Sequence, residues 1–146
     1  MAVDVLTEIT ISRPADVVAA YAGDPSNAPE WYANIASIRW ETEPPVRKGS
    51  RVAFTASFLG RQLAYTYEIT EFIPGERLVM RTAQGPFPME TTYTWRSAGD
   101  RSTRMTLRNR GEPAGFSKLA GPFMTFAMRR ANRKDLRKLR SILEAT

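Results

Sequence analysis

A long series of alternating apolar and polar residues between residues 38 and 109 constrains this chain more than any other feature. Turn-forming residues such as Gly60, Gly75 and Asp100 divide the series into six short runs. A period of two is typical of strands that bury one face. With a similar run over residues 3–11, the pattern predicts a seven-stranded antiparallel sheet that has one wet face and one apolar face.

The apolar face of such a sheet needs a cover, and the C-terminal segment can supply it. From Pro122 to about Glu144 neither glycine nor proline interrupts the chain, and proline suits the first turn of a helix. Helical spacing places one apolar stripe along this segment, opposite a basic side: Met124, Met128, Ala131, Leu136, Leu139, Ile142 and Leu143. We therefore expect a long amphipathic helix packed on the sheet.

Residues 12–35 predict two short helices between the first and second strands. Ser12 can cap a first helix that contains Pro14 in its first turn, and the sequence DPSN at residues 24–27 breaks that helix. A second helical piece then ends near Trp31 and Tyr32. Because large apolar residues do not suit an exposed loop, we expect this stretch to close one end of the sheet.

Composition limits the possible chemistry. The chain of 146 residues has no cysteine and no histidine, which removes thiolate chemistry and the commonest metal ligand and proton-transfer side chain. We expect one domain over residues 1–146, with no metal and no cofactor. No long apolar run or signal-peptide pattern is present, so we expect a cytoplasmic protein without membrane insertion. We also expect a monomer or homodimer.

The net charge of +6 comes from the end of the chain. Residues 116–146 contain eight basic side chains against Asp135 and Glu144, whereas the preceding residues balance. A solvated helix face explains this pattern most simply. Nucleic-acid binding is the less favoured interpretation, because no exposed aromatic residues are interleaved with the basic ones for base stacking.

The order of several motifs resembles the START-like (SRPBCC) superfamily, in particular its polyketide cyclase/dehydrase branch. Asp24, Pro29, Trp31 and Ile35 match the family's pattern after the short helices, and YEITEFIPGERL at residues 67–78 and DLRKLRSILEA at residues 135–145 are also similar. The resemblance implies an α+β helix-grip fold, in which a curved seven-stranded antiparallel sheet wraps around the C-terminal helix. It also implies an apolar cavity between them for lipids, polyketides or other hydrophobic molecules.

The candidate ligand-binding residues combine inward strand positions, including adaptable methionines and polar groups that could orient a ligand, with nearby loop and helix residues. They are Trp31, Phe54, Phe58, Tyr65, Tyr67, Met80, Phe87, Met89, Thr91, Tyr93, Met105, Asn109, Phe123, Met124 and Met128. The alternative is that they only pack a core, and that Phe87 and Phe123 close its end.

Asn132 and Asp135 also fall in the apolar stripe of the helix. Asp135 could be a buried acid, although pairing with an arginine or bonding to the backbone is the simpler expectation.

Three functions follow from these patterns. The first is binding of a hydrophobic small molecule in the cavity. The second is an aromatase/cyclase-type enzyme that uses the same cavity, with a tyrosine or a bound water handling the proton and no catalytic residue identified. The third is nucleic-acid or acidic-partner binding through the basic helix face.

Overall fold

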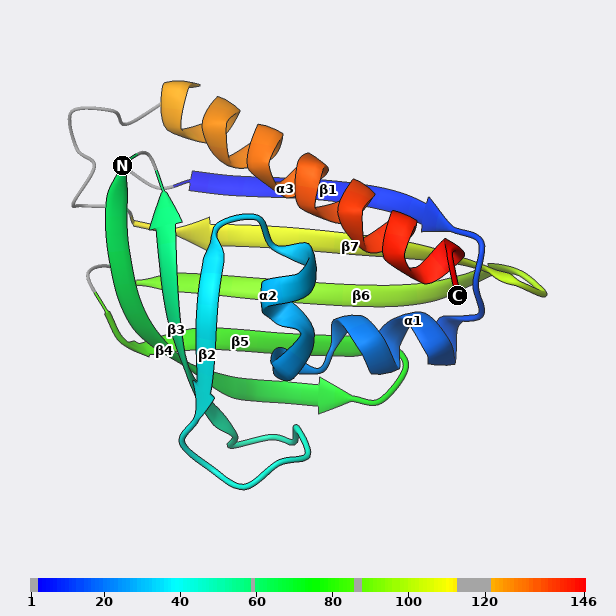
Figure 1. Ribbon diagram of the computed structural model, residues 1–146, viewed down its shortest axis with the longest axis horizontal. Coiled ribbons are helices and arrows are strands. Elements are labelled where there is room, and N and C mark those ends of the chain that lie inside the picture. Colours follow the sequence, from blue (N-terminus) through cyan, green and yellow to red (C-terminus); the bar gives the residue numbers. More distant parts are fainter. Residues whose placement is uncertain (1–2, 59, 86–87, 113–121) are drawn as a thin grey trace.

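The computed structural model describes the chain except for residues 1–2, 59, 86–87 and 113–121 and the side chain of Phe58 (Figure 1). One antiparallel sheet contains all seven predicted strands in the spatial order β1-β7-β6-β5-β4-β3-β2. The strands are β1 (Val3–Ile11), β2 (Ile35–Trp40), β3 (Arg51–Phe58), β4 (Arg61–Ile73), β5 (Arg77–Gln84), β6 (Met89–Gly99) and β7 (Ser102–Gly111). The alternation in the sequence thus predicted the sheet correctly.

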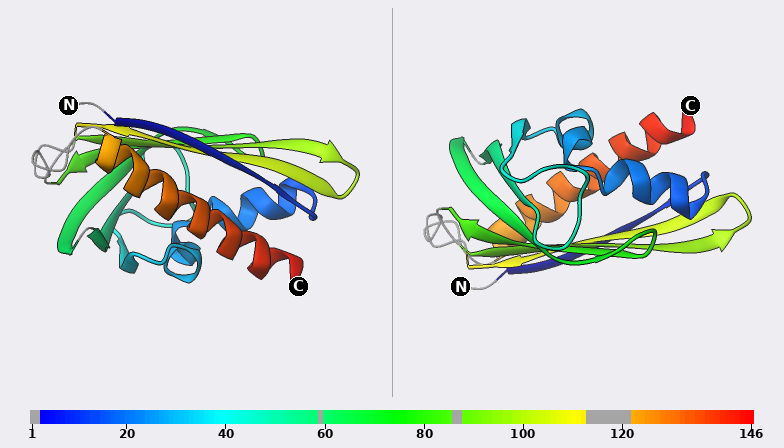
Figure 2. Two further views of the ribbon diagram at one scale, coloured as in Figure 1. Left: turned by 90° about the horizontal axis from the view of Figure 1, so that it is seen from above. Right: turned by 90° about the horizontal axis from the view of Figure 1, so that it is seen from below.

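The sheet is strongly curved. β2, β3 and the start of β4 turn toward the side on which the C-terminal helix α3 (Pro122–Glu144) lies (Figure 2). The register of strand pairing shifts between β4 and β5, and again between β2 and β3 near Ile35 and Ser37. These shifts accompany the bend. Such irregularities increase the local twist and bend of a strand, so the sheet can surround part of the helix. This confirms the helix-grip architecture.

Helix α3 buries the predicted stripe and exposes its basic side. Its buried residues are Met124, Met128, Asn132, Asp135, Leu136, Leu139 and Leu143. The basic side chains from Arg130 to Arg140 are exposed. The apolar stripe therefore packs on the sheet, as its helical spacing indicated.

Three short helical elements lie on the concave side of the sheet, with α1 near the C-terminal end of α3 (Figure 1). They are α1 (Ala15–Ala22), the 3₁₀ turn η1 (Pro25–Asn27) and α2 (Ala28–Trp31). The prediction that Ser12 caps α1 was wrong. Pro14 occupies the N-cap position, without a side-chain cap, so the helix begins at Ala15, two residues beyond where a Ser12 cap would start it. The Ser12 N–H instead donates to Glu144 at 2.8 Å, joining the start of this segment to the end of α3.

The outer face of the sheet is the predicted wet face, and it contains ion pairs between neighbouring strands. Glu90 accepts from Arg81 at 2.6 Å and from Arg110 at 2.8 Å, and Arg108 donates to Asp4 at 2.6 Å. These hydrogen bonds hold the pKa values of Asp4 and Glu90 below their ordinary range against the opposing effect of burial. Because the arginines are exposed, solvent screens these pairs, and we expect them to contribute little to stability.

Gly111 lies at a crowded crossing of strand ends, where it pairs with Val3 on one side and Met89 on the other. A Cβ atom there would lie 2.2 Å from the Met89 sulfur and 2.5 Å from the Pro88 carbonyl oxygen. We expect Gly111→Ala to lower the free energy of unfolding by about 1–3 kcal/mol, because the backbone must move to relieve the contact. Urea unfolding measures the loss.

A useful comparison is Gly49→Ala, where φ is +93° but nothing lies within 4 Å of the added atom. That variant reports backbone strain without crowding. Wild-type stability in Gly111→Ala would contradict the close packing of β6 and β7 at this point.

Candidate functional site

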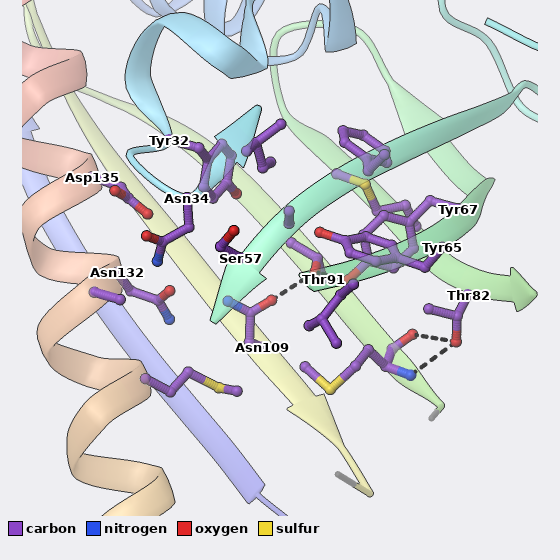
Figure 3. Close-up of a pocket in the computed structure, with 18 of the residues that line it drawn as sticks. Tyr32, Asn34, Ser57, Tyr65, Tyr67, Thr82, Thr91, Asn109, Asn132 and Asp135 are labelled. Carbon is purple, nitrogen blue, oxygen red and sulfur yellow. Dashed lines mark hydrogen bonds between the residues drawn. The ribbon is translucent and has the colours of Figure 1, made fainter. Parts of the chain in front are cut away.

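A cavity of about 150 Å³ lies between the concave face of the sheet, the segment after α2 and one side of α3 (Figure 3). Its wall is mainly aromatic and aliphatic, with polar groups at both the helix side and the sheet side. The wall consists of Tyr32, Asn34, Ile35, Phe54, Ala56, Ser57, Leu63, Tyr65, Tyr67, Met80, Thr82, Met89, Thr91, Tyr93, Asn109, Met124, Met128, Ala131, Asn132 and Asp135. An apolar space of this size can hold one aromatic ring.

Most of the residues predicted as ligand-binding lie in this wall. They are Phe54, Tyr65, Tyr67, Met80, Met89, Thr91, Tyr93, Asn109, Met124 and Met128. Two further candidates, the Phe58 side chain and Phe87, lie outside the described residues. The period of the strands thus identified the side chains that face the cavity.

The structure places the other three predicted residues outside the cavity wall. Trp31 and Met105 are 1% and 0% exposed in the main core cluster and do not line the cavity, although Trp31 packs against the wall residues Tyr32 and Tyr93. Met105 points to the concave face as predicted, but it lies opposite Trp95, toward the end of the sheet that α1 covers (Figure 1). Phe123 is 53% exposed, because its position on α3 turns it away from the stripe that contains Met124.

Several wall residues were not predicted as ligand contacts. Tyr32 and Ile35 had been expected to close one end of the sheet, and Asn132 and Asp135 had been noted only as polar members of the helix stripe. Ala56, Leu63 and Ala131 also face inward, but small or purely aliphatic side chains like these do not by themselves indicate a ligand site. Asn34, Ser57 and Thr82 carry no inward signal in the alternating pattern, since they lie at strand ends or near shifts in pairing.

On the sheet side, three side chains form a hydrogen-bonded chain. The Thr91 hydroxyl donates to Asn109 Oδ1 at 2.6 Å, and the Tyr67 and Thr91 hydroxyl oxygens are 2.9 Å apart. Because the only Thr91 hydroxyl proton is used toward Asn109, Tyr67 must be the donor to Thr91. The Asn109 Nδ2 group has no partner within the described chain and is free to donate to a bound molecule (Figure 3).

The tyrosines of the wall are hydrogen-bond donors and not bases. Burial raises the pKa of Tyr67 to about 12, although its bond to Thr91 opposes the shift. Burial also raises the pKa values of Tyr32, Tyr65 and Tyr93 well above the ordinary value. The Tyr32 and Tyr93 hydroxyls bond to each other at 2.5 Å, so this pair has one proton left to offer.

On the helix side, Asp135 and Asn132 lie one turn apart on α3. Asp135 is 3% exposed, and its Oδ1 accepts from the Ala33 backbone N–H at 3.1 Å, which is the backbone bond that the sequence offered as one alternative. Burial raises the pKa of Asp135 to about 6, while this bond and the nearby Lys134 act against the shift. Asn132 Nδ2 is buried without a partner in the described structure.

The sequence profile of a family described as polyketide cyclase/dehydrase and lipid transport matches residues 2–144. The chain belongs to this polyketide cyclase/dehydrase family. The match spans both the strands and α3, so it includes the whole described wall of the cavity. No curated protein matches the chain.

Solved structures share the fold of this polyketide cyclase/dehydrase family member at low sequence identity. A START superfamily protein from Mycobacterium smegmatis has a TM-score of 0.83 and 14% identity, covering 97% of both chains. The Zhui aromatase/cyclase from a Streptomyces species has a TM-score of 0.82 and 13% identity, covering 99% of this chain and 94% of that one. A protein from Thermus thermophilus has a TM-score of 0.82 and 21% identity, covering 98% of this chain and 99% of that one.

Within the described residues of this family member, no helix is long and apolar enough to cross a membrane. The same residues contain no group of three or more histidine, cysteine, aspartate or glutamate side chains placed to hold a metal ion.

The hydrogen bond between Tyr32 and Tyr93 in the cavity wall can be tested by its effect on stability. We expect Tyr93→Phe to lower the free energy of unfolding by about 1 kcal/mol, because it leaves the buried Tyr32 hydroxyl without its partner. Tyr65→Phe is the matched control, since no hydrogen bond of the Tyr65 hydroxyl occurs among the described residues. Equal losses in the two variants, measured by urea unfolding, would argue against a hydrogen bond between Tyr32 and Tyr93.

Proposed function

We propose that this protein binds a small, mainly apolar molecule in the cavity between the sheet and α3. The observation that carries the proposal is the wall itself, in which aromatic and methionine side chains surround a space of about 150 Å³. Tightly packed cores contain few voids of this size. Membership of a family that includes lipid transport supports the same conclusion.

The expected affinity follows from the area that a ligand would bury. One aromatic ring removes about 200 Å² from water, which gives a gross driving force of about 5 kcal/mol at 25 cal/mol per Å². After the cost of association, a single-ring probe should bind with a Kd near the millimolar range. A larger natural ligand would gain affinity from the additional apolar area that it buries.

Filling the cavity tests the proposal. Ala131 lies in the wall on α3, and we expect Ala131→Phe to place a ring where the ligand would lie. Binding of toluene and benzyl alcohol, measured by ligand-observed NMR, should fall at least tenfold, while far-UV circular dichroism stays as in the wild type.

Ser141→Phe is the matched control for this experiment, because Ser141 is exposed on the same helix and outside the cavity wall. If both variants bind the probes as the wild type does, or if the wild type binds neither probe, the cavity is not the binding site.

A cyclase-type enzyme is the second candidate, and Asp135 is the observation that favours it. Its carboxyl group, with a pKa raised by burial to about 6, could exchange a proton near neutral pH. The wall tyrosines, whose pKa values lie above the ordinary value, are better suited to polarise a carbonyl group as donors. The likeness to an aromatase/cyclase structure supports this candidate at the level of the fold.

The enzyme candidate predicts that the protein accelerates ring closure of a linear triketone ester, and that Asp135→Asn lowers the rate at least about 100-fold. A wild-type rate equal to that in buffer would remove this candidate and leave the binding proposal intact.

A further inference from the structure

The ionisable side chains of the described cavity wall carry only negative charge near neutral pH. Among the described wall residues, Asp135 is the only side chain that ionises near neutral pH, and none is arginine or lysine. Histidine does not occur in the chain. The basic residues of α3 from Arg130 to Arg140 are exposed on the opposite side of the helix. The wall therefore offers an anion to a ligand and no cation.

The Asp135 carboxylate has few partners for a buried charge. It accepts one hydrogen bond, from the Ala33 N–H, and no described arginine or lysine forms an ion pair with it. The charged group that acts on it is its neighbour Lys134, which is exposed. A buried carboxylate normally requires a paired cation or several donors. A bound molecule could therefore supply the cation or the additional hydrogen-bond donor that the Asp135 carboxylate lacks.

Aromatic rings also favour a positive charge in this space. Tyr32, Phe54, Tyr65, Tyr67 and Tyr93 all contribute to the wall. The negative faces of such rings attract an ammonium group within about 6 Å of their centres. The Tyr32 and Tyr93 hydroxyls are close enough to Asp135 for its charge to affect both of their pKa values. Their side of the cavity therefore combines aromatic rings with a carboxylate.

We propose that the cavity selects apolar amines, with the ligand's ammonium group paired to Asp135 and its ring or alkyl part against the aromatic wall. This inference rests on the proposed binding function and specifies the chemical class of the ligand. Carboxylates and phosphates of similar size should bind more weakly than neutral molecules, since they would meet a buried carboxylate with no compensating cation among the described wall residues.

The pH dependence of binding follows from the groups that face Asp135. These are the Tyr32 and Tyr93 hydroxyls, which stay neutral, the Ala33 N–H and the uncharged amide of Asn132, with Lys134 charged on the exposed side. An alkylammonium group stays charged up to about pH 10. Amine binding therefore strengthens as pH rises through the Asp135 pKa of about 6. A neutral carbonyl ligand held by protonated Asp135 would show the opposite trend.

Three probes of nearly equal size test the proposal: benzylamine, benzyl alcohol and benzoate. At pH 7.5 we expect benzylamine to bind the wild-type protein at least tenfold more tightly than benzyl alcohol, and benzoate at least tenfold more weakly than benzyl alcohol. Lowering the pH to 5.0 should weaken benzylamine binding at least fivefold and change benzyl alcohol binding less than twofold. Calorimetry or ligand-observed NMR measures these five affinities.

Asp135→Asn keeps the size of the side chain and an oxygen that can accept from Ala33. We expect it to lower benzylamine affinity at least tenfold while benzyl alcohol stays within threefold, and circular dichroism checks its fold. Asp16→Asn, at an exposed position on α1, is the matched control and should leave both affinities unchanged. The pH series on the wild-type protein gives an independent result if the variant folds poorly.

The proposal is overturned if benzylamine binds no more tightly than benzyl alcohol, if benzoate binds most tightly, or if amine binding weakens as pH rises from 5.0 to 7.5. Binding of benzyl alcohol without a preference for the amine overturns only the amine selectivity. Failure of all three probes to bind removes the proposed binding function and this inference with it.

Discussion

Replacing Trp31 with alanine is expected to lower the free energy of unfolding by about 3–5 kcal/mol, as is usual when a buried tryptophan is truncated. Trp31 is 1% exposed, and its ring centre lies 4.1 Å from that of Tyr32 and 5.8 Å from that of Tyr93. The cavity left by the indole would open next to two wall residues. Urea unfolding monitored by circular dichroism measures the loss of stability.

Trp31→Phe is the informative control, because the Trp31 indole N–H is buried without a partner in the described structure. Phenylalanine keeps most of the ring contacts and removes that unpaired donor, so we expect a loss of less than about 1.5 kcal/mol. Both variants should bind benzyl alcohol whenever they are folded. A variant of Trp31 that keeps full stability but loses binding would instead place Trp31 in contact with the ligand.

Removing the Asp135 charge is expected to stabilise the free protein at neutral and higher pH. The folded-state pKa of Asp135, about 6, lies above its ordinary value of 3.8, so the folded state binds the proton more readily than the unfolded state does. The contribution of Asp135 to stability therefore decreases as pH rises from about 4 to about 6, by up to about 3 kcal/mol in total, and is constant beyond that. Asparagine lacks this dependence.

The measurement is the difference in unfolding free energy between Asp135→Asn and the wild type at several pH values. We expect the difference to be smallest near pH 4 and to reach a plateau in favour of the variant above about pH 7. Comparing the two proteins at each pH cancels the other carboxylates, such as Glu90, whose lowered pKa acts in the opposite direction. A difference that does not vary with pH would show that Asp135 is not desolvated in the folded protein.

The sheet and the long helix were predictable because each repeats one simple period over many residues. Alternation at Met89, Thr91 and Tyr93 identified the inward face of β6, and the stripe from Met124 to Leu143 identified the buried side of α3. A one-residue error in either period would place polar residues in the core, so the pattern is strongly determined. The helix cap at Ser12 failed because the helix begins two residues later than expected, with Pro14 at its N-cap position.

The position of the cavity along the concave face was not predictable in the same way. Met105 and Tyr93 share an inward direction, yet only Tyr93 lies in the wall, because α1 covers the other end of the sheet. Asn34 and Ser57 entered the wall through the bend and the shifted pairing near Ile35. Periodicity gives the direction of a side chain and not the element that lies opposite it.

The sequence by itself determined which residues form strands and helices and which faces they bury, because these depend on neighbours two to four positions away. Only the tertiary structure placed the Asp135 carboxylate beside Ala33, Tyr32 and Tyr93, without a basic side chain among the described residues of the wall. Burial and charge pairing depend on residues about a hundred positions apart, such as Ala33 and Asp135. Local periodicity has no information about such distant contacts, and the electrostatics of the cavity follow from them.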